Sequence, residues 1–262
     1  MVLVIMMKER IVSPKTLVDI SKLPELSKIS YDEKNGLSIG ATATHLQIES
    51  SPHVAEHYPS LRDAFHTIGN VRIRSVGTLG GNLAYSEPQC NPPAILTALD
   101  AQVHVLGPNG QRAIPAEDFV RGIFESALEP GEIITHVTVP PPKPRSATCF
   151  RKFTIRSETD KPTAVVAVTV ELDPQMRRVS GCRIAVGAIG PKTYRCFEAE
   201  KMVKSARGVD DLDYAGAAKR ASDEFEVIED ANGPAWFKKQ TTAVIIRDVL
   251  ADAVGSAKKG GA

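Results

Sequence analysis

The sequence predicts an α+β protein built in two unequal parts. A proline-rich segment, Pro140-Pro141-Pro142-Lys143-Pro144, favours an extended and stiff connection between them. Beyond it, three strand patterns precede three helical patterns, an order typical of an α+β domain. The 262 residues also suffice for two ordinary cores. We therefore expect one domain over residues 1–142, a smaller one over 146–254 and a disordered tail over 255–262.

The first part opens on an apolar run over residues 1–7. This run is far too short to span a bilayer and has no basic segment before it, so it predicts a buried strand or the start of a helix. The pattern that follows predicts a short strand, then a turn or short helix, then a second strand. These lie at residues 17–20, 21–26 and 37–41.

Three short helices are expected next. Thr44 is a candidate cap for a helix over 45–49, and Ser51-Pro52 is a favourable start for another that ends near Tyr58-Pro59. Apolar residues then recur at helical spacing on one face. That face carries Leu61, Ala64, Phe65 and Ile68.

The remaining elements follow the same reasoning. The first part predicts a buried helix over 93–99, a strand over 102–106, a turn at 108–110 and a strand over 133–139. The second part predicts strands over 148–155, 163–172 and 181–189, then helices over 197–205, 214–225 and 236–254. The last helix has an apolar stripe made by Ala243, Ile246, Leu250 and Val254.

The most informative segment is Thr78-Leu79-Gly80-Gly81-Asn82. Gly80 and Gly81 lack Cβ, so they tolerate positive φ and close approach of another group. Successive backbone N–H groups in such a turn form a concavity that suits an anion. Thr78 and Asn82 add a hydroxyl and an amide for phosphate oxygens. A Gly-Gly pair alone is more often an ordinary turn, so the flanking residues decide between the two interpretations.

Those flanks carry a specific resemblance. Arg72 and Arg74 precede the glycines, and the segment IGNVRIRSVGTLGGNLAYSEPQCNPPAILTALDAQVHVLG resembles the flavin-binding segment of the molybdenum hydroxylase family. Its members include xanthine dehydrogenases and aerobic carbon monoxide dehydrogenases, whose flavoprotein (medium) subunit holds FAD with such a stretch. The resemblance covers roughly residues 8–254. It implies an FAD-binding domain of the PCMH type followed by a smaller C-terminal domain of the carbon monoxide dehydrogenase flavoprotein type.

The resemblance also implies FAD contacts outside the 78–82 motif. Asn91 takes the place of an acidic residue that lies near FAD in the family, although it is also a candidate N-cap of the next helix. Ile68, Ile134 and Lys152 align with further flavin contacts. The alternatives are core packing for the two isoleucines and a solvated charge for Lys152, with Arg151 as the competing alignment.

The function implied by the family is electron transfer in an oxidoreductase. FAD on this subunit receives electrons from 2Fe-2S clusters and reduces an external acceptor, while substrate is oxidised at a molybdopterin cofactor elsewhere. The implied partners are a molybdopterin-binding large subunit and a 2Fe-2S small subunit, arranged as a dimer of heterotrimers. The cofactor carries the redox chemistry, so no catalytic acid or base is expected in this chain.

The start of the chain departs from the family pattern. In the family, a first glycine-rich FAD loop similar to Ala-Gly-Gly-Thr lies just before an apolar run like residues 1–7. We therefore expect this chain to begin after that loop and to hold FAD less firmly. A remnant subunit that docks without flavin, and a stand-alone flavin reductase of the PCMH type, are the alternatives.

Composition argues against several other functions. The net charge of +1 gives no sign of a nucleic-acid partner or of membrane insertion. The four cysteines form no C-x-x-C pair, so no zinc or iron–sulfur site is expected, and scattered thiols suit a reducing cytoplasm. His53-Val54-Ala55-Glu56-His57 matches a zinc-peptidase pattern. Its helix is short and no third ligand is evident, which favours a solvated helix face.

Overall fold

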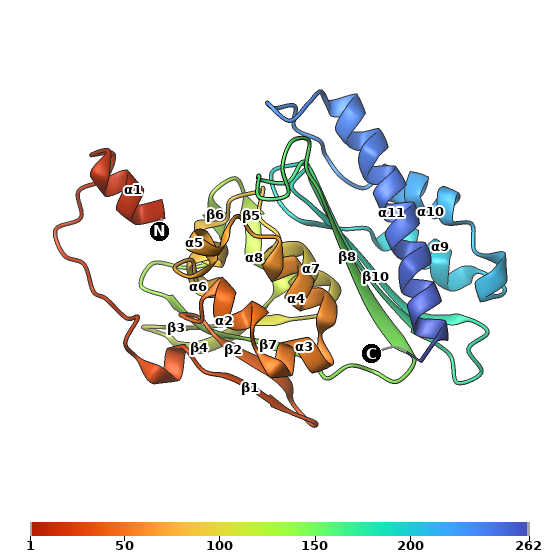
Figure 1. Ribbon diagram of the computed structural model, residues 1–262, viewed down its shortest axis with the longest axis horizontal. Coiled ribbons are helices and arrows are strands. Elements are labelled where there is room, and N and C mark those ends of the chain that lie inside the picture. Colours follow the sequence, from red (N-terminus) through yellow and green to blue (C-terminus); the bar gives the residue numbers. More distant parts are fainter. Residues whose placement is uncertain (1, 261–262) are drawn as a thin grey trace.

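The computed structural model describes residues 2–260 and contains two antiparallel sheets with helices packed on them (Figure 1). The first sheet has the strand order β1-β2-β7-β3-β4. Its strands are β1 (Ile29–Asp32), β2 (Gly36–Gly40), β3 (Gln102–Gly107), β4 (Gly110–Pro115) and β7 (Ile133–Val139). A separate two-stranded hairpin joins β5 (Val120–Gly122) to β6 (Glu125–Ser126).

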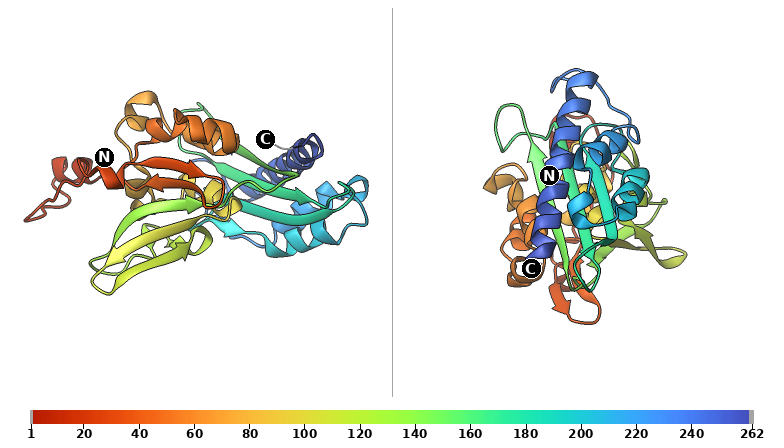
Figure 2. Two further views of the ribbon diagram at one scale, coloured as in Figure 1. Left: turned by 90° about the horizontal axis from the view of Figure 1, so that it is seen from below. Right: turned by 90° about the vertical axis from the view of Figure 1, so that its right-hand side faces the viewer.

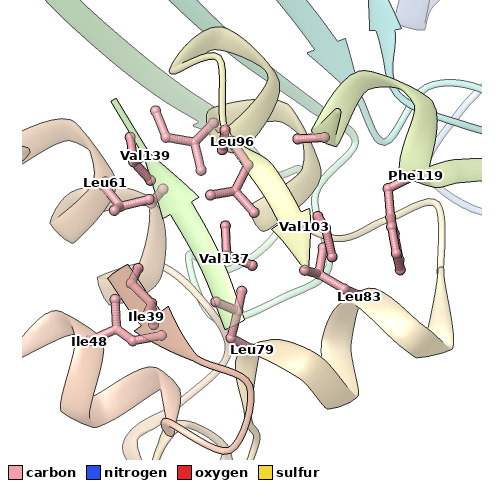
Figure 3. Packing of buried hydrophobic residues seen from close by; sticks show 14 of the residues in the cluster. Ile39, Ile48, Leu61, Leu79, Leu83, Leu96, Val103, Phe119, Val137 and Val139 are labelled. Carbon is pink, nitrogen blue, oxygen red and sulfur yellow. The ribbon is translucent and has the colours of Figure 1, made fainter. Parts of the chain in front are cut away.

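Short helices cover one face of this sheet. They are α2 (His45–Glu49), α3 (Pro52–His57), α4 (Pro59–His66), α5 (Val71–Arg74), α6 (Leu79–Tyr85), α7 (Pro92–Ala98) and α8 (Ala116–Phe119). Alternating residues of the strands, such as Val103 and Val137, point into the core that these helices close, and Leu79 and Leu83 enter it from α6 (Figure 3). The first core therefore holds α6, which carries the glycine motif, directly against the sheet.

The second sheet has the order β11-β10-β9-β8. Its strands are β8 (Ser146–Phe153), β9 (Ala164–Leu172), β10 (Val179–Gly187) and β11 (Tyr194–Arg195). The helices that follow them in the chain are α9 (Phe197–Ser205), the 3-10 helix η2 (Val209–Asp211), α10 (Tyr214–Ala221) and α11 (Ala235–Lys258). The long helix α11 packs along β8 and β9. The left view of Figure 2 shows both sheets from below. Strand β9 is a nearly continuous buried run because α11 covers one face and α7 the other.

Helix α7 joins the two cores. Every residue of α7 is buried, as the sequence predicted. Ile95 and Leu96 lie in the first core, while Ala94 packs against Val165 and Ala188 of the second part. The glycine motif and the second sheet are thus placed relative to each other by one short, fully buried helix.

The predicted Thr44 cap is confirmed in detail. Thr44 Oγ1 accepts a hydrogen bond from the Gln47 N–H at 3.2 Å, and Gln47 Oε1 accepts from the Thr44 N–H at 2.8 Å. This reciprocal arrangement is a capping box, which satisfies two backbone donors at the start of α2. It fixes the direction in which the chain leaves the first sheet.

Several sequence predictions are wrong at the two ends of the chain. Residues 2–7 of the apolar run are helical, in α1 (Val2–Lys8), but α1 buries none of its residues and projects from the body (Figure 1). Residues 17–20 form no strand, because within residues 2–260 no strand pairs with them, and Val18 is 81% exposed. The next turn is confirmed as the 3-10 helix η1 (Pro24–Leu26).

The predicted disordered tail is also wrong over its first half. Helix α11 continues through Gly255 to Lys258, because Val254 and Ala257 still pack in the second core. Residues 261–262 lie outside the described chain. In the same part, α10 ends at Ala221 rather than at residue 225, and Ser222 is its C-cap.

Candidate functional site

The glycine motif begins a helix rather than a turn. Thr78 is the N-cap of α6, and its Oγ1 accepts from the Gly81 N–H at 3.1 Å. Gly80 and Gly81 lie in the first helical turn, and neither takes a positive φ. The expectation of a left-handed double-glycine turn is therefore wrong, and another property of glycine explains these residues.

Close approach explains Gly80. A Cβ on Gly80 would lie 2.8 Å from Ala41 Cβ and 2.9 Å from Ala41 O. The Gly80 N–H donates to that same oxygen at 2.8 Å, and the Leu79 N–H donates to Ala43 O at 3.0 Å. The bare backbone of α6 thus lies directly on the segment that connects β2 to α2. Gly81 differs, because it is exposed and would meet only the cap oxygen of Thr78.

These contacts leave no row of free donors at the start of α6. The N–H groups of Leu79, Gly80 and Gly81 bond to Ala43 O, Ala41 O and Thr78 Oγ1, and the Asn82 N–H bonds to Thr78 O. The predicted concavity of unpaired N–H groups is therefore wrong for this structure. Any group that binds here meets side chains and the solvent face of Gly81.

Side-chain atoms without partners lie beside this backbone. Six buried side-chain polar atoms in residues 2–260 have no hydrogen-bond partner. Three of them, Asn82 Oδ1, Thr42 Oγ1 and His45 Nδ1, belong to α6, to the segment packed on it and to the first residue of α2. The other three, on Thr97, Arg145 and Thr163, lie elsewhere in the chain. Buried polar atoms are nearly always paired, so orphans clustered in one region are what a missing polar ligand or ordered water leaves behind. This observation fits the ribityl and ribose hydroxyls of a bound flavin nucleotide.

The end of α4 forms the second part of the site. We call residues 64–69 the 64–69 turn. Asn91, which is 3% exposed, donates through Nδ2 to Ala64 O and to Thr67 Oγ1, each at 2.9 Å. Lys152 Nζ donates to Thr67 O at 2.7 Å and to Glu158 O at 2.7 Å. Three predicted residues, Ile68, Asn91 and Lys152, therefore meet at this one turn.

The contacts of Asn91 and Lys152 differ from the helix-cap and solvated-charge alternatives. Asn91 is the N-cap of α7 by position, but its side chain caps nothing and instead holds the turn. Burial lowers the pKa of Lys152, against the raising influence of Asp160 and Glu158. Side chains alternate along β8, so Arg151 points the other way and pairs with Asp252 on α11 at 2.6 Å.

The two isoleucines behave differently. Ile68 is only partly buried and stands in the 64–69 turn. Ile134 is 5% exposed, pairs with Val105 across the sheet and belongs to the first core. The structure therefore brings Ile68 to the other predicted residues and leaves Ile134 in the strand core.

The zinc-peptidase pattern has a packing role. His57 stacks on Tyr31 with ring centroids 3.8 Å apart, and His53 lies 6.5 Å from the same ring. The structure groups no three metal-ligating side chains anywhere in residues 2–260. These imidazoles pack α3 against β1.

Sequence reasoning missed the contacts that hold this site together. Thr67 contributes a backbone carbonyl, which no side-chain pattern can signal. Arg74, one of the two basic residues before the glycines, pairs with Glu49 at 2.7 Å. Lys161 pairs with Glu87 at 3.0 Å and so draws the loop after β8 towards α6. The partners in each pair are too far apart in sequence to be matched.

Comparison with known proteins now identifies the family. The model of the FAD binding domain in molybdopterin dehydrogenase matches residues 2–142, and that of the CO dehydrogenase flavoprotein C-terminal domain matches residues 148–253. This chain belongs to the FAD-binding medium subunits of the molybdenum hydroxylases. The predicted family, α+β fold class and FAD cofactor are thereby confirmed.

Individual relatives agree with this assignment. The glyceraldehyde dehydrogenase medium chain of Sulfolobus acidocaldarius is 30% identical over 93% of this chain and 84% of its own length. The carbon monoxide dehydrogenase medium chain of Afipia carboxidovorans is 30% identical over 98% and 87%. Quinoline 2-oxidoreductase from Pseudomonas putida 86 superposes with a TM-score of 0.87, at 27% identity, over 98% of this chain and 87% of that one.

Its relatives are medium subunits of multi-subunit molybdenum hydroxylases, and this chain is likewise an FAD-binding oxidoreductase subunit. Its role is that of the flavoprotein component. None of the helices in residues 2–260 has the length and apolar character needed to cross a bilayer.

Proposed function

We propose that this chain holds FAD between the start of α6 and the 64–69 turn and passes electrons from a partner's 2Fe-2S clusters to an external acceptor. The observation that carries the proposal is the convergence of Asn91, Lys152 and Ile68 on one turn, with the unpaired Asn82 Oδ1 nearby on α6. Bound FAD supplies the redox chemistry, and the protein supplies binding and orientation.

Each part of the site has a distinct task in this proposal. Thr78 caps α6 and so fixes Leu79, Gly80 and Gly81, while Asn82 accepts a hydrogen bond from a flavin hydroxyl. The exposed face of Gly81 leaves space for the nucleotide backbone. Ile68 supplies an apolar surface at the 64–69 turn, whereas Ile134, buried in the strand core, is a proposed contact on the family resemblance alone.

Asn91 and Lys152 hold the 64–69 turn by hydrogen bonds, in addition to their proposed contacts with the flavin. Asn91 spends its amide N–H groups on Ala64 and Thr67, so only its carbonyl oxygen is left for a ligand. Lys152 places a positive charge beside the 64–69 turn, where it would attract the negative charge of a bound flavin nucleotide. These two residues are proposed FAD contacts at the 64–69 turn.

The proposal extends to the assembly. We infer a dimer of heterotrimers with a molybdopterin-binding large subunit and a 2Fe-2S small subunit, in the cytoplasm, with the domain boundary at the 140–144 segment. All four cysteines, Cys90, Cys149, Cys182 and Cys196, are free thiols, which supports a reducing compartment. Native mass spectrometry of the co-expressed subunits tests the stoichiometry: a single heterotrimer would exclude the dimer.

Flavin retention tests the site itself. Asn82→Leu removes the unpaired acceptor, and we expect it to lower the FAD content of the purified complex, read from absorbance in the visible region. Thr97→Val is the matched control, because Thr97 Oγ1 is also buried without a partner, but on α7, three residues after Ala94, which packs against Val165 of the second sheet. Equal FAD content in both variants would remove Asn82 from the site. A flavin-free wild-type complex that still assembles would show a docking subunit without a redox role.

A further inference from the structure

A buried ion pair lies under the flavin side of the first domain. Arg74 Nε donates to Glu49 Oε2 at 2.7 Å, and the two side chains are only 11% and 14% exposed. Arg74 Nη1 also donates to Ile68 O at 3.3 Å and to Gly69 O at 3.2 Å. One guanidinium therefore ties the end of α2 to the 64–69 turn.

The carboxylate of Glu49 makes a second connection. Its Oε1 lies 2.6 Å from His66 Nδ1, at the end of α4. Burial raises the pKa of Glu49, but the hydrogen bonds from His66 and Arg74 outweigh it and leave that pKa below its usual value. Glu49 is thus a stable anion that holds α4 and α5 together.

The same turn is held from its other side. Asn91 takes Ala64 O and Lys152 takes Thr67 O, while Arg74 takes the next two carbonyls. Gly69 has φ +49, and a Cβ there would lie 2.9 Å from Ile73 Cδ1, so the backbone has one compact arrangement. The Ile68 side chain stands among these anchors and remains partly exposed.

We propose that the Arg74–Glu49 pair is a positioning device that fixes Ile68 against the flavin. The inference rests on the proposed FAD site. It gives Arg74 a different task from phosphate binding: the Arg74 side chain is buried, and its Nε and Nη1 are spent on Glu49 and on the turn. Arg72, by contrast, is exposed and makes no such contact with the turn.

A purely structural ion pair would have different consequences, and a double-mutant cycle separates the two. Arg74→Lys keeps the charge but loses the planar fork that spans Glu49 and the two carbonyls. We expect the Kd of the complex for FAD to rise about tenfold and the visible absorption band of the flavin to shift. Ile68→Ala should produce a similar band shift. In the Ile68→Ala background, Arg74→Lys should then add at most about twofold, because its target is gone.

Arg112→Lys is the matched control. Arg112 also pairs with a glutamate, Glu132, at 2.7 Å and with a backbone carbonyl, Ala127 O, at 2.8 Å, but on β4 away from α6. It should leave the FAD Kd and the visible spectrum unchanged. Should Arg74→Lys fail to fold, Glu49→Gln removes the anionic partner of the pair and is put through the same cycle.

The outcomes are distinct. A tenfold effect of Arg74→Lys that is lost on Ile68→Ala supports positioning. Additive effects, an unchanged Kd, or an equal loss in Arg112→Lys would overturn positioning while leaving the FAD site intact. A wild-type complex that binds no FAD would overturn the proposed function, and positioning with it.

Discussion

Replacing Gly80 by alanine tests how α6 is packed. The new Cβ would lie within 2.9 Å of Ala41 O, a backbone atom that cannot swing away. Overpacking of this kind costs about 1–3 kcal/mol. Lengthening the Gly80 N–H bond to Ala41 O adds about 1 kcal/mol, and alanine's better helix propensity returns about 1 kcal/mol. The net expectation is a loss of about 1–3 kcal/mol.

Gly81→Ala is the matched variant one residue along. Its Cβ would meet only Thr78 Oγ1, at 2.9 Å, so the cap hydroxyl must rotate. Losing that cap costs about 1 kcal/mol, and the gain in helix propensity offsets it, so the net change in stability is about zero. The two glycines therefore differ although they are neighbours with the same secondary structure.

Urea unfolding of the flavin-free proteins measures the difference. With a slope of about 2 kcal/mol per molar, Gly80→Ala should lower the midpoint by about 1 M, while Gly81→Ala should leave it nearly unchanged. Equal losses at both positions, or a larger loss at Gly81, would refute close packing as the reason for Gly80. Circular dichroism should show native helix content in both variants.

Three further predictions concern the rest of the chain. Arg195 donates to both carboxylate oxygens of the buried Glu200, so Arg195→Ala leaves that charge without its partner and should lower the free energy of unfolding by about 3–5 kcal/mol. Lys201→Ala, which breaks an exposed ion pair, should change the free energy of unfolding by less than about 1 kcal/mol. Burial, together with the charge of Arg74, lowers the pKa of His45 to about 4. The unfolded chain therefore protonates His45 at a higher pH than the folded chain does, and about 3 kcal/mol of stability is lost as pH falls from 6.5 to 4. His45→Phe should flatten this dependence of stability on pH, and an unchanged dependence would contradict it. Gly255→Ala meets no atom within 4 Å inside α11 and should stabilise by about 0.5–1 kcal/mol, and no gain in thermal midpoint would argue against a helix there.

Local sequence signals predicted much of the fold. Thr44 specified a helix start without help from distant residues, and the apolar run of α7 specified burial. The pattern of residues 133–139 likewise identified strand β7. In each case the information lies within a few consecutive residues, where propensity, capping and periodicity act.

The misses have a different physical origin. Gly-Gly signals a turn locally, but packing on Ala41 makes it the first turn of α6. Residues 17–20 have a strand pattern, yet a strand requires a neighbour, which sequence alone does not supply. In the candidate site, the motif and the convergent residues came from family resemblance. The acceptors of the 64–69 turn could not be foreseen, since they are backbone carbonyls.

Most acceptors of the 64–69 turn do not depend on its side chains. Every residue type offers a carbonyl oxygen, so the turn keeps its four backbone acceptors, whereas Thr67 Oγ1 depends on residue type and Gly69 on its φ of +49. The constraint falls instead on the distant donors Arg74, Asn91 and Lys152. We expect natural diversity to accumulate at the exposed His66, since Ala64 and Phe65 are buried in the first core. A library randomised at His66 should therefore yield more FAD-retaining members than one randomised over the donors.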